Sequence, residues 1–338
     1  MHLPDVAFVG PCGNTHICSS LDRAARDLGL KSSVRDTREA YAGTAFVRKF
    51  LWHFGDRRPP RLQRFSADLL ERLAGNLPSV LVTLGPAPVS GAALHELRNR
   101  GVLCVNYSTD DPFNPAVMAR WHLRDLPAYD IVFTTRRANV ADLQRQGCSD
   151  VRYLQFAYDP HLFGTLSSGN QSPARELEVL FIGGADADRA EFFAAFLRCG
   201  PTPTLVGAYW ERYSHTRALS LGTRPVASVR ELTARACINI CLVRRANRDG
   251  HVMRSFEIPA VGGFMLAEDT GEHREIFGPE GRCVLYFRTP LEAAQKSRWV
   301  IANPGDRHRM ASAAHDLIRR GANTYGDRLK TLLGMTRE

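Results

Sequence analysis

Residues 237–268 read CINICLVRRANRDGHVMRSFEIPAVGGFMLAE and carry the clearest pattern of the chain. It predicts a buried strand over 238–243, a polar loop rich in arginine, a short helix that opens near Arg254, and a second apolar strand after Gly262 and Gly263. A loop that leaves the carboxyl end of a strand and enters a helix N-terminus is where an open α/β sheet binds anionic ligands. The stretch therefore predicts an α/β fold with an anion site in this loop.

Charged side chains are concentrated in this loop and in the helix that follows it. They comprise four cations and two carboxylates, namely Arg244, Arg245, Arg248, Arg254, Asp249 and Glu257. If Asp249 lies in the loop and Glu257 on the helix, both can face one crevice, where one lies near reacting atoms and the other accepts hydrogen bonds from sugar hydroxyls. Alternatively, the loop charges are solvated and Glu257 is stabilised in the first helical turn by the helix dipole. The spacing alone leaves both interpretations open.

The run RSFEIPAVGGFMLAE over 254–268, followed by Glu275, Phe277 and Gly278, resembles the C-terminal signature of the CgeB-like (spore maturation protein) glycosyltransferases. These enzymes are relatives of the family 4 glycosyltransferases. The resemblance implies the GT-B architecture, in which two Rossmann-like, doubly wound parallel-sheet domains face a cleft and a C-terminal helix crosses back to the first domain. It covers most of residues 100–330 and is poor over 30–75. The broader group has Glu as its first acid, whereas this chain has Asp249.

The length and composition fit a soluble protein of two domains. At 338 residues the chain exceeds the size at which a single core usually stops growing. We expect an acceptor-binding domain over 1–165, a nucleotide-sugar-binding domain over 176–320, and a C-terminal helix over 321–338. Composition marks the segment TLSSGNQSPAR, residues 165–175, as the linker between the two domains.

The composition also bears on location and partners. Hydrophobic residues make up 44% of the chain without any run long enough to span a membrane, and the first ten residues lack the basic region of a secretory signal, so we expect a cytoplasmic protein. The eight cysteines form no CxxC pair and are interpreted as small buried hydrophobes in a reducing compartment, without a metal site. The net charge of +9 favours a nucleotide diphosphate, a phosphorylated acceptor, nucleic acid or an anionic membrane surface, and does not choose among them.

In the N-terminal half, apolar strands alternate with helical patterns, which predicts a parallel sheet whose strand ends line a crevice. We expect strands over 79–84, 102–107, 131–134 and 151–156, with a helix over 115–122. Asp110 and Asp111 follow one of these strands and can supply a base or bind hydroxyls, or they can cap the next helix. The first strand leads into a glycine-containing turn with Gly13 and His16. This turn can bind a phosphate, or it can be an ordinary connection between strand and helix. The G-x-G-x-x-G spacing of dinucleotide-binding loops is absent.

Residues 44–64 place six Lys and Arg residues among aromatic side chains. Such a pattern can bind nucleic acid or a phosphorylated acceptor, or line an acceptor cleft. It can equally be an amphipathic surface helix that ends before Pro59 and Pro60, and we favour this interpretation because charge runs are commonly solvated faces.

After the expected linker, a strand over 177–182 ends in Gly183 and Gly184 and is followed by Arg189. In the resembling family, a strand of this kind with a following Arg begins the nucleotide-binding domain. Trp210 follows the next strand and is interpreted as a core aromatic rather than as a platform for a nucleobase.

The resemblance implies a metal-independent transferase that uses a nucleotide-diphosphate sugar and retains the anomeric configuration. Arg254 and Arg189 would stabilise the leaving diphosphate, with Arg244 or Arg248 in reserve. Glu257 would bind the ribose and Asp249 would lie near the donor sugar. The backbone at Gly13, Gly183 and Gly184 would approach the ligand, and acid–base work would fall to Asp110, Asp111 and His16. The acceptor would be a small molecule, a glycan or a protein. Two alternatives stay open: a nucleotide-sugar-binding protein without turnover, and a sugar-nucleotide epimerase.

Overall fold

The computed structural model describes residues 3–13, 15–164 and 177–335. The chain forms two compact units. Unit 1 comprises Met1–Gln155, Arg245–Arg248 and Tyr325–Glu338, and unit 2 comprises Phe156–Arg244 and Asp249–Thr324. The expected linker, residues 165–175, lies outside the described residues.

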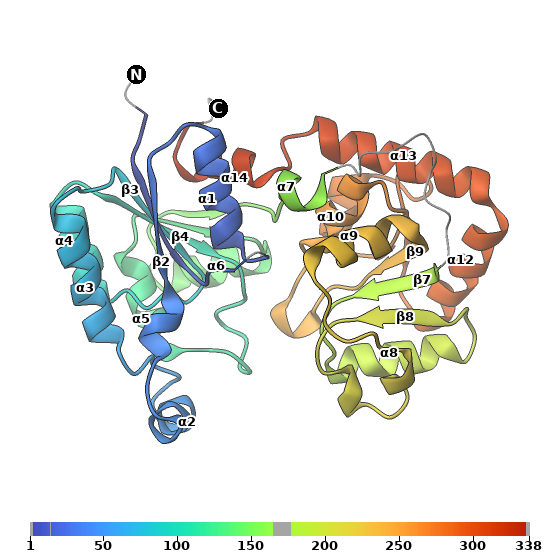
Figure 1. The fold of residues 1–338 in the computed structure, drawn as a ribbon, viewed down its shortest axis with the longest axis horizontal. Coiled ribbons are helices and arrows are strands. Elements are labelled where there is room, and N and C mark those ends of the chain that lie inside the picture. The colour runs from blue at the N-terminus through green and yellow to red at the C-terminus, as the bar shows by residue number, and fades with distance from the viewer. Residues whose placement is uncertain (1–2, 14, 165–176, 336–338) are drawn as a thin grey trace. The chain divides into compact units, whose positions relative to one another are not determined.

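Unit 1 is built on a parallel sheet with the strand order β2-β1-β3-β4-β5-β6 (Figure 1). The strands are β1 (Val6–Gly10), β2 (Ser32–Asp36), β3 (Val80–Leu84), β4 (Leu103–Ser108), β5 (Ile131–Thr134) and β6 (Val151–Tyr153). The helices are α1 (Ile17–Asp27), α2 (Ala45–Phe54), α3 (Leu62–Ala74), α4 (Gly91–Asn99), α5 (Arg120–Asp125), α6 (Ala138–Arg145) and α14 (Tyr325–Leu332).

Both faces of the unit 1 sheet are covered by helices. Apolar side chains of β1, β3, β4 and β5 pack against α3, α4 and α6, and Figure 1 shows α1 on the other side of the sheet from α3 and α4. The last helix, α14, packs on α1 and buries Leu329 and Leu332. The C-terminal helix therefore belongs to the unit that the N-terminus begins.

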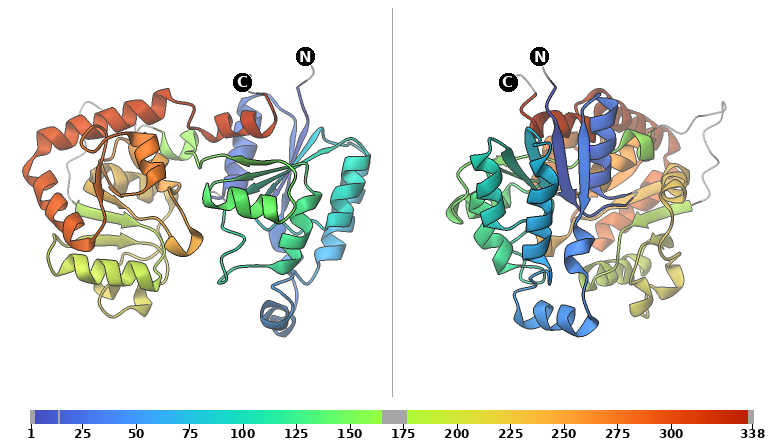
Figure 2. Two further views of the ribbon diagram at one scale, coloured as in Figure 1. Left: turned by 180° about the vertical axis from the view of Figure 1, so that it is seen from behind. Right: turned by 60° about the vertical axis from the view of Figure 1, so that its left-hand side comes forward.

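Unit 2 repeats this organisation with the strand order β11-β10-β9-β7-β8, again all parallel. Its strands are β7 (Leu177–Ile182), β8 (Pro203–Val206), β9 (Ala236–Cys241), β10 (Met265–Glu268) and β11 (Leu285–Phe287). Its helices are α7 (Pro160–Phe163), α8 (Ala187–Leu197), α9 (Val226–Arg235), α10 (Arg254–Val261), α11 (Gly271–Phe277), α12 (Pro290–Ala302) and α13 (Pro304–Arg320). Figure 2 shows the unit from two further sides.

The core of unit 2 contains many aromatic side chains. Phe181 on β7 and Phe193 on α8 both contact the indole of Trp210, which is fully buried, as the core interpretation of this residue predicts. The indole Nε1 donates a hydrogen bond of 2.9 Å to the carbonyl of Gly183, so that the tryptophan holds the end of β7 in place.

Each sheet reverses its strand order next to its first strand, between β1 and β3 in unit 1 and between β7 and β9 in unit 2. Open α/β sheets bind their ligands at the carboxyl ends of the strands beside such a reversal. The sequence analysis named the loops 10–16, after β1, and 183–189, after β7, as candidate ligand sites. Both loops follow strands beside such a reversal, and so does the loop after β9.

The structure differs from the sequence-based expectation at several elements; for example, the strand expected over 151–156 is β6, which ends at Tyr153. Strand β2, SSVRD, was not expected, because it is a polar edge strand with no fully buried residue and thus lacks the apolar pattern of the other strands. The helix expected over 115–122 is confined to α5, which starts at Arg120, because Asp111 and Asn114 use their side chains to cap turns in the preceding segment. In the described part of the chain, no helix is long and apolar enough to cross a membrane.

Candidate anion-binding site

In unit 2, the turn after β7 and the end of β8 touch through their backbones. Gly183 donates a hydrogen bond of 2.8 Å to the carbonyl of Val206, and Gly207 has a φ of +146°. A Cβ atom at Gly207 would lie 2.2 Å from the carbonyl oxygen of Gly183, so no other residue type fits there without a shift of the backbone. The two glycine turns thus give a closely packed floor without side chains.

Arg189 lies above this floor. The N-cap carboxylate of Asp186 accepts a hydrogen bond of 3.0 Å from the backbone N–H of Arg189, and the Arg189 guanidinium donates one of 3.0 Å to the carbonyl of Gly184. The Arg189 side chain is only 11% exposed and its Nε has no hydrogen-bond partner in the described part of the chain. Burial, and then the positive charge of Arg244, lower its pKa. A buried cation with an unmet donor beside a second cation is stabilised by an anion.

The loop after β9 brings Arg244 and Asp249 to the same place. The backbone N–H groups of both residues bond across the loop, from Arg244 to the Asp249 carboxylate and from Asp249 to the Arg244 carbonyl, each at 3.3 Å. The Arg244 guanidinium lies 3.4 Å from the carboxylate of Asp186, and the charges of Arg244 and Asp249 both act on Arg189. The structure therefore gathers Arg189, Arg244 and Asp249 around the end of β7.

Helix α10 contributes Arg254 and Glu257. The guanidinium of Arg254 lies over the ring of Phe163, 5.6 Å from its centroid, and forms an ion pair with the buried carboxylate of Glu257. Burial raises the pKa of Glu257, an effect that Arg254 opposes and the nearby Asp159 reinforces. Arg254 therefore favours the charged form of Glu257, which burial disfavours.

Beneath α10 lies a buried polar network that the sequence did not bring to attention. The Nδ1 of His273 faces the carbonyl of Glu268 at 2.7 Å and so carries the proton, which leaves Nε2 to accept a hydrogen bond of 2.8 Å from the Ser255 hydroxyl. Burial lowers the pKa of His273 to about 4. His251 is fixed similarly, since its Nε2 accepts from the backbone N–H of Phe156 and its Nδ1 faces a carboxylate oxygen of Glu272. His251, Ser255 and Glu268 lie inside the quoted stretch 237–268, whereas Glu272 and His273 lie beyond it, so the quoted stretch contains only part of this network.

The remaining sequence candidates belong to unit 1. Both carboxylate oxygens of buried Asp111 bind Arg248, at 2.6 and 2.9 Å, and Arg248 also bonds to Asp142 at 2.6 Å and to Asn139 at 2.9 Å. Arg248 is thus the partner of unit 1 side chains. Asp110 is exposed and accepts a hydrogen bond of 3.3 Å from Asn247.

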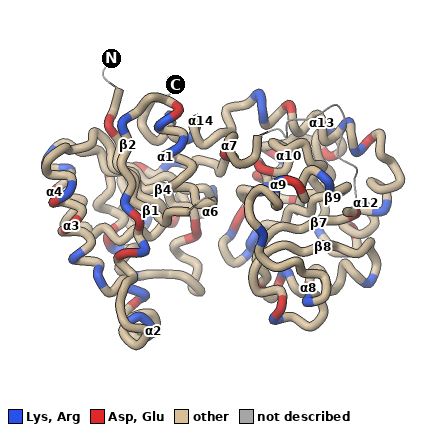
Figure 3. Tube along the Cα trace, viewed as in Figure 1, with Lys and Arg blue, Asp and Glu red and all other residues tan. Residues whose placement is uncertain are grey.

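Gly13 and His16 are also exposed, in the turn between β1 and α1, and His16 is the N-cap residue of α1 without using its side chain as a cap. The Gly13 backbone adopts a φ of +154°, and a Cβ atom there would lie 2.9 Å from the imidazole of His16. Glycine at this position therefore leaves room for the imidazole. Figure 3 shows how the charged residues are distributed along each unit.

Comparisons with known proteins bear on the fold and on the domain that carries this site. Residues 189–334 match the family model described as "Glycosyl transferase-like", whereas no curated protein matches the chain in sequence. Solved structures with similar coordinates include HepE of Anabaena in complex with UDP, at 14% identity, 98% coverage of both chains and a TM-score of 0.66. Sucrose-phosphate synthase of Thermosynechococcus elongatus is similar at 13% identity over 99% of this chain and 98% of that chain, with a TM-score of 0.71.

A third similar structure is the UDP-N-acetylglucosamine 2-epimerase homologue of Listeria monocytogenes, at 11% identity, 98% coverage of both chains and a TM-score of 0.57. The structural likenesses establish the fold, and the family model covers most of unit 2. The chain therefore has the GT-B fold expected from the sequence, with a glycosyl transferase-like domain over residues 189–334, and the predicted enzyme class, glycosyltransferase, is confirmed.

Proposed function

We propose that this glycosyltransferase transfers a sugar from a nucleotide-diphosphate donor that binds unit 2, as the CgeB-like resemblance implies. The observation that carries the proposal is Arg189, a buried guanidinium with an unmet donor above a floor of glycine backbone. A diphosphate supplies acceptor oxygens for this unmet donor, and its negative charge adds to that of Asp186, whose carboxylate lies 3.9 Å from the Arg189 Nε. HepE, whose fold is similar, is known in complexes with UDP and with UDP-glucose, so uridine nucleotides are the first donors to test.

In this proposal the cations of unit 2 take the place of a metal at the leaving group. Arg189 and Arg254 stabilise the charge that develops on the diphosphate as the glycosidic bond breaks, and Arg244 lies close enough to Arg189 to share this work. Arg248 was the alternative candidate for this role in the sequence analysis. Its guanidinium binds Asp111, Asp142 and Asn139, so we assign it a structural role instead.

The carboxylates divide the remaining roles. Glu257, which pairs with Arg254, accepts hydrogen bonds from the ribose, and Asp249 lies near the donor sugar. Acid–base work on the acceptor falls to the exposed His16 and Asp110, because both oxygens of Asp111 are already bound by Arg248. Retention of anomeric configuration follows the related family 4 enzymes by analogy.

A thermal-shift experiment tests the donor site. The wild type, Glu257→Gln, Arg189→Met and the exposed control Glu231→Gln are heated with UDP, GDP, dTDP and their sugar conjugates. A nucleotide present at about 100 times its dissociation constant should stabilise the wild type and the control by about 2.7 kcal/mol, and both site variants should lose most of this gain. Equal responses in all four proteins would exclude these residues, and no response to any nucleotide would contradict the proposal.

Incubation of the responding sugar nucleotide with the enzyme alone then separates the activities. Slow release of the free nucleoside diphosphate without an acceptor supports transfer. Conversion of the donor into an epimer without release supports the epimerase alternative, and binding without either reaction supports a binding protein.

A further inference from the structure

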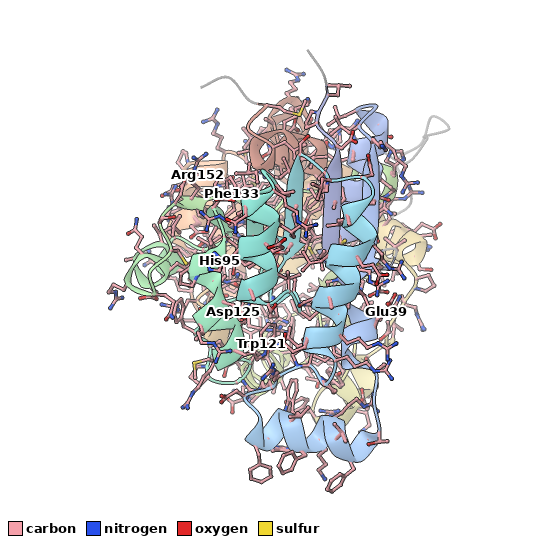
Figure 4. All side chains as sticks on the ribbon, turned by 90° about the vertical axis from the view of Figure 1, so that its left-hand side faces the viewer. Glu39, His95, Trp121, Asp125, Phe133 and Arg152 are labelled. Atoms are coloured by element: carbon pink, nitrogen blue, oxygen red, sulfur yellow. The ribbon has the colours of Figure 1, made fainter. Side chains whose placement is uncertain are left out.

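Helix α2 of unit 1 exposes an apolar surface that the proposed function does not use. None of its ten residues is buried. Phe46, Phe50 and Phe54 follow one another at intervals of four residues and so form a ridge along one side of the helix. Phe46 and Phe54 are each 79% exposed, and the Phe54 ring contacts rings of its own helix, those of Phe50 at 5.5 Å and His53 at 6.4 Å. Figure 2 shows this helix standing out from the rest of unit 1, and Figure 4 shows its side chains extending away from the unit.

The chain holds α2 in this exposed position at its base. Thr44 caps the start of the helix by accepting a hydrogen bond of 3.4 Å from the backbone N–H of Val47, and Gly55 ends it. Arg57 then donates 2.7 and 3.3 Å hydrogen bonds to the carbonyls of Met118 and Pro115 and lies over the Trp52 ring. The helix is therefore fixed at its C-terminal end while its phenylalanine ridge faces solvent.

The segment that carries this ridge is also rich in cations. The residues at and just after α2 include Arg48, Lys49, Arg58 and Arg61, none of which has a carboxylate partner in the described part of the chain. The one acid of the segment, Asp56, lies 3.9 Å from Arg120. Elsewhere in unit 1, arginines such as Arg98 and Arg100 pair with neighbouring acids. The surface that α2 exposes thus combines large apolar side chains with unneutralised positive charge.

We propose that α2 and the residues up to Arg61 attach the protein to a lipid bilayer that carries anionic headgroups. A convex ridge of aromatic side chains fits a fluid surface that it can enter, and the cations of the same segment are attracted by the negative surface potential. A second copy of the chain is a poorer partner, because two equally basic helices would repel each other. Nucleic acid is recognised by grooves in which bases stack, which a protruding helix does not provide.

Vesicle sedimentation with the full-length protein tests this assignment. The protein is mixed with vesicles of phosphatidylglycerol and phosphatidylcholine, or of phosphatidylcholine alone, and the bound fraction is measured against lipid concentration. The wild type should bind the anionic vesicles at least about tenfold more tightly. Phe46→Ser/Phe50→Ser should weaken this binding at least about tenfold, because two aromatic side chains no longer enter the bilayer. Arg48→Glu/Lys49→Glu should abolish the preference for anionic lipid.

The matched control removes two exposed apolar side chains from another helix. Leu291→Ser/Trp299→Ser on α12 should bind vesicles like the wild type. Because all four apolar positions are exposed, both double variants should keep the thermal midpoint of the wild type, which separates lost binding from lost folding.

Three results would overturn the assignment. The wild type could remain in the supernatant with anionic vesicles, or the phenylalanine variant could sediment as the wild type does. Light scattering could also reveal a dimer that the same variant abolishes without any vesicle binding, which would assign the ridge to a second copy. None of these results bears on donor binding, which the nucleotide thermal shift reports separately.

Discussion

Replacement of Arg248 by Met should destabilise unit 1, although Arg248 lies more than a hundred residues along the chain from each of its partners. Its guanidinium binds both oxygens of Asp111, one oxygen of Asp142 and the amide oxygen of Asn139. Asp111 and Asn139 are buried. In Arg248→Met, the Asp111 carboxylate would keep only its 3.0 Å hydrogen bond from the Phe113 backbone.

The magnitude follows from what the buried carboxylate loses. Removal of one partner of a buried ion pair costs about 3–5 kcal/mol, because the remaining charge is left uncompensated. The Arg248 side chain is 39% exposed, so water can approach the carboxylate in its place and the cost falls to about 2 kcal/mol. For a domain of this size, this corresponds to a decrease of roughly 4–8 °C in the melting temperature.

The assay is thermal unfolding combined with hydrogen exchange, which shows the unit that is affected. Exchange should accelerate in residues 106–118, at the end of β4. The control is Arg145→Met, which removes the other arginine that binds Asp142 and is 76% exposed, and it should cost below about 1 kcal/mol. In a double-mutant cycle, Asp111→Asn with Arg248→Met should cost less than the two single changes together. Equal losses for Arg248→Met and Arg145→Met, or faster exchange confined to unit 2, would refute the reasoning.

Two further predictions concern the cores of the units. Gly207→Ala should unfold unit 2 or shift its backbone, with a cost above about 3 kcal/mol in stability and loss of any nucleotide response. The control Gly29→Ala should cost about 1 kcal/mol, because Gly29 has a φ of +69° but open space around it. Comparable melting temperatures for the two variants would contradict this prediction. Burial lowers the pKa of His122 and of His273 to about 4, so each contributes stability that is present above pH 6.5 and is lost, up to about 3 kcal/mol, as the pH falls toward 4. His122→Phe should flatten this dependence for unit 1 alone, and an unchanged pH profile would show that His122 is not the group that titrates.

Much of the fold could be predicted from the sequence, because apolar strands buried on both faces carry a strong local pattern. Strands β3 and β5, for example, were placed within a residue of their observed bounds. Strand β2 could not be predicted, because Ser32, Ser33 and Arg35 give it the composition of a loop. Its pairing with β1 is what makes it a strand. Backbone hydrogen bonds to a strand that is distant in sequence do not change the local pattern of hydrophobic residues.

The candidate site divides in the same way. The spacing of Arg254 and Glu257 on one helix is local, and the structure brings the two into an ion pair. The roles of Arg189 and Arg248 depend instead on which acids lie nearby in space. Asp111 and Asp142 are remote from Arg248 in sequence, so the partner that occupies its guanidinium could not be foreseen.

The interactions of Arg248 and Arg189 also distinguish a structural arginine from one that binds a ligand. Arg248 has its donors satisfied by carboxylates, and its pKa is raised by them, above all by Asp111. Arg189 is held where burial lowers its pKa and where its Nε lacks a hydrogen bond, which costs free energy in the unliganded protein. An apolar side chain in its place would remove this desolvation cost, while the neighbouring Asp186 carboxylate, 37% exposed, would stay solvated. Arg189→Met should therefore melt no lower than the wild type without nucleotide and yet fail to gain stability when nucleotide is added, whereas a purely structural arginine would lower the melting temperature in both conditions.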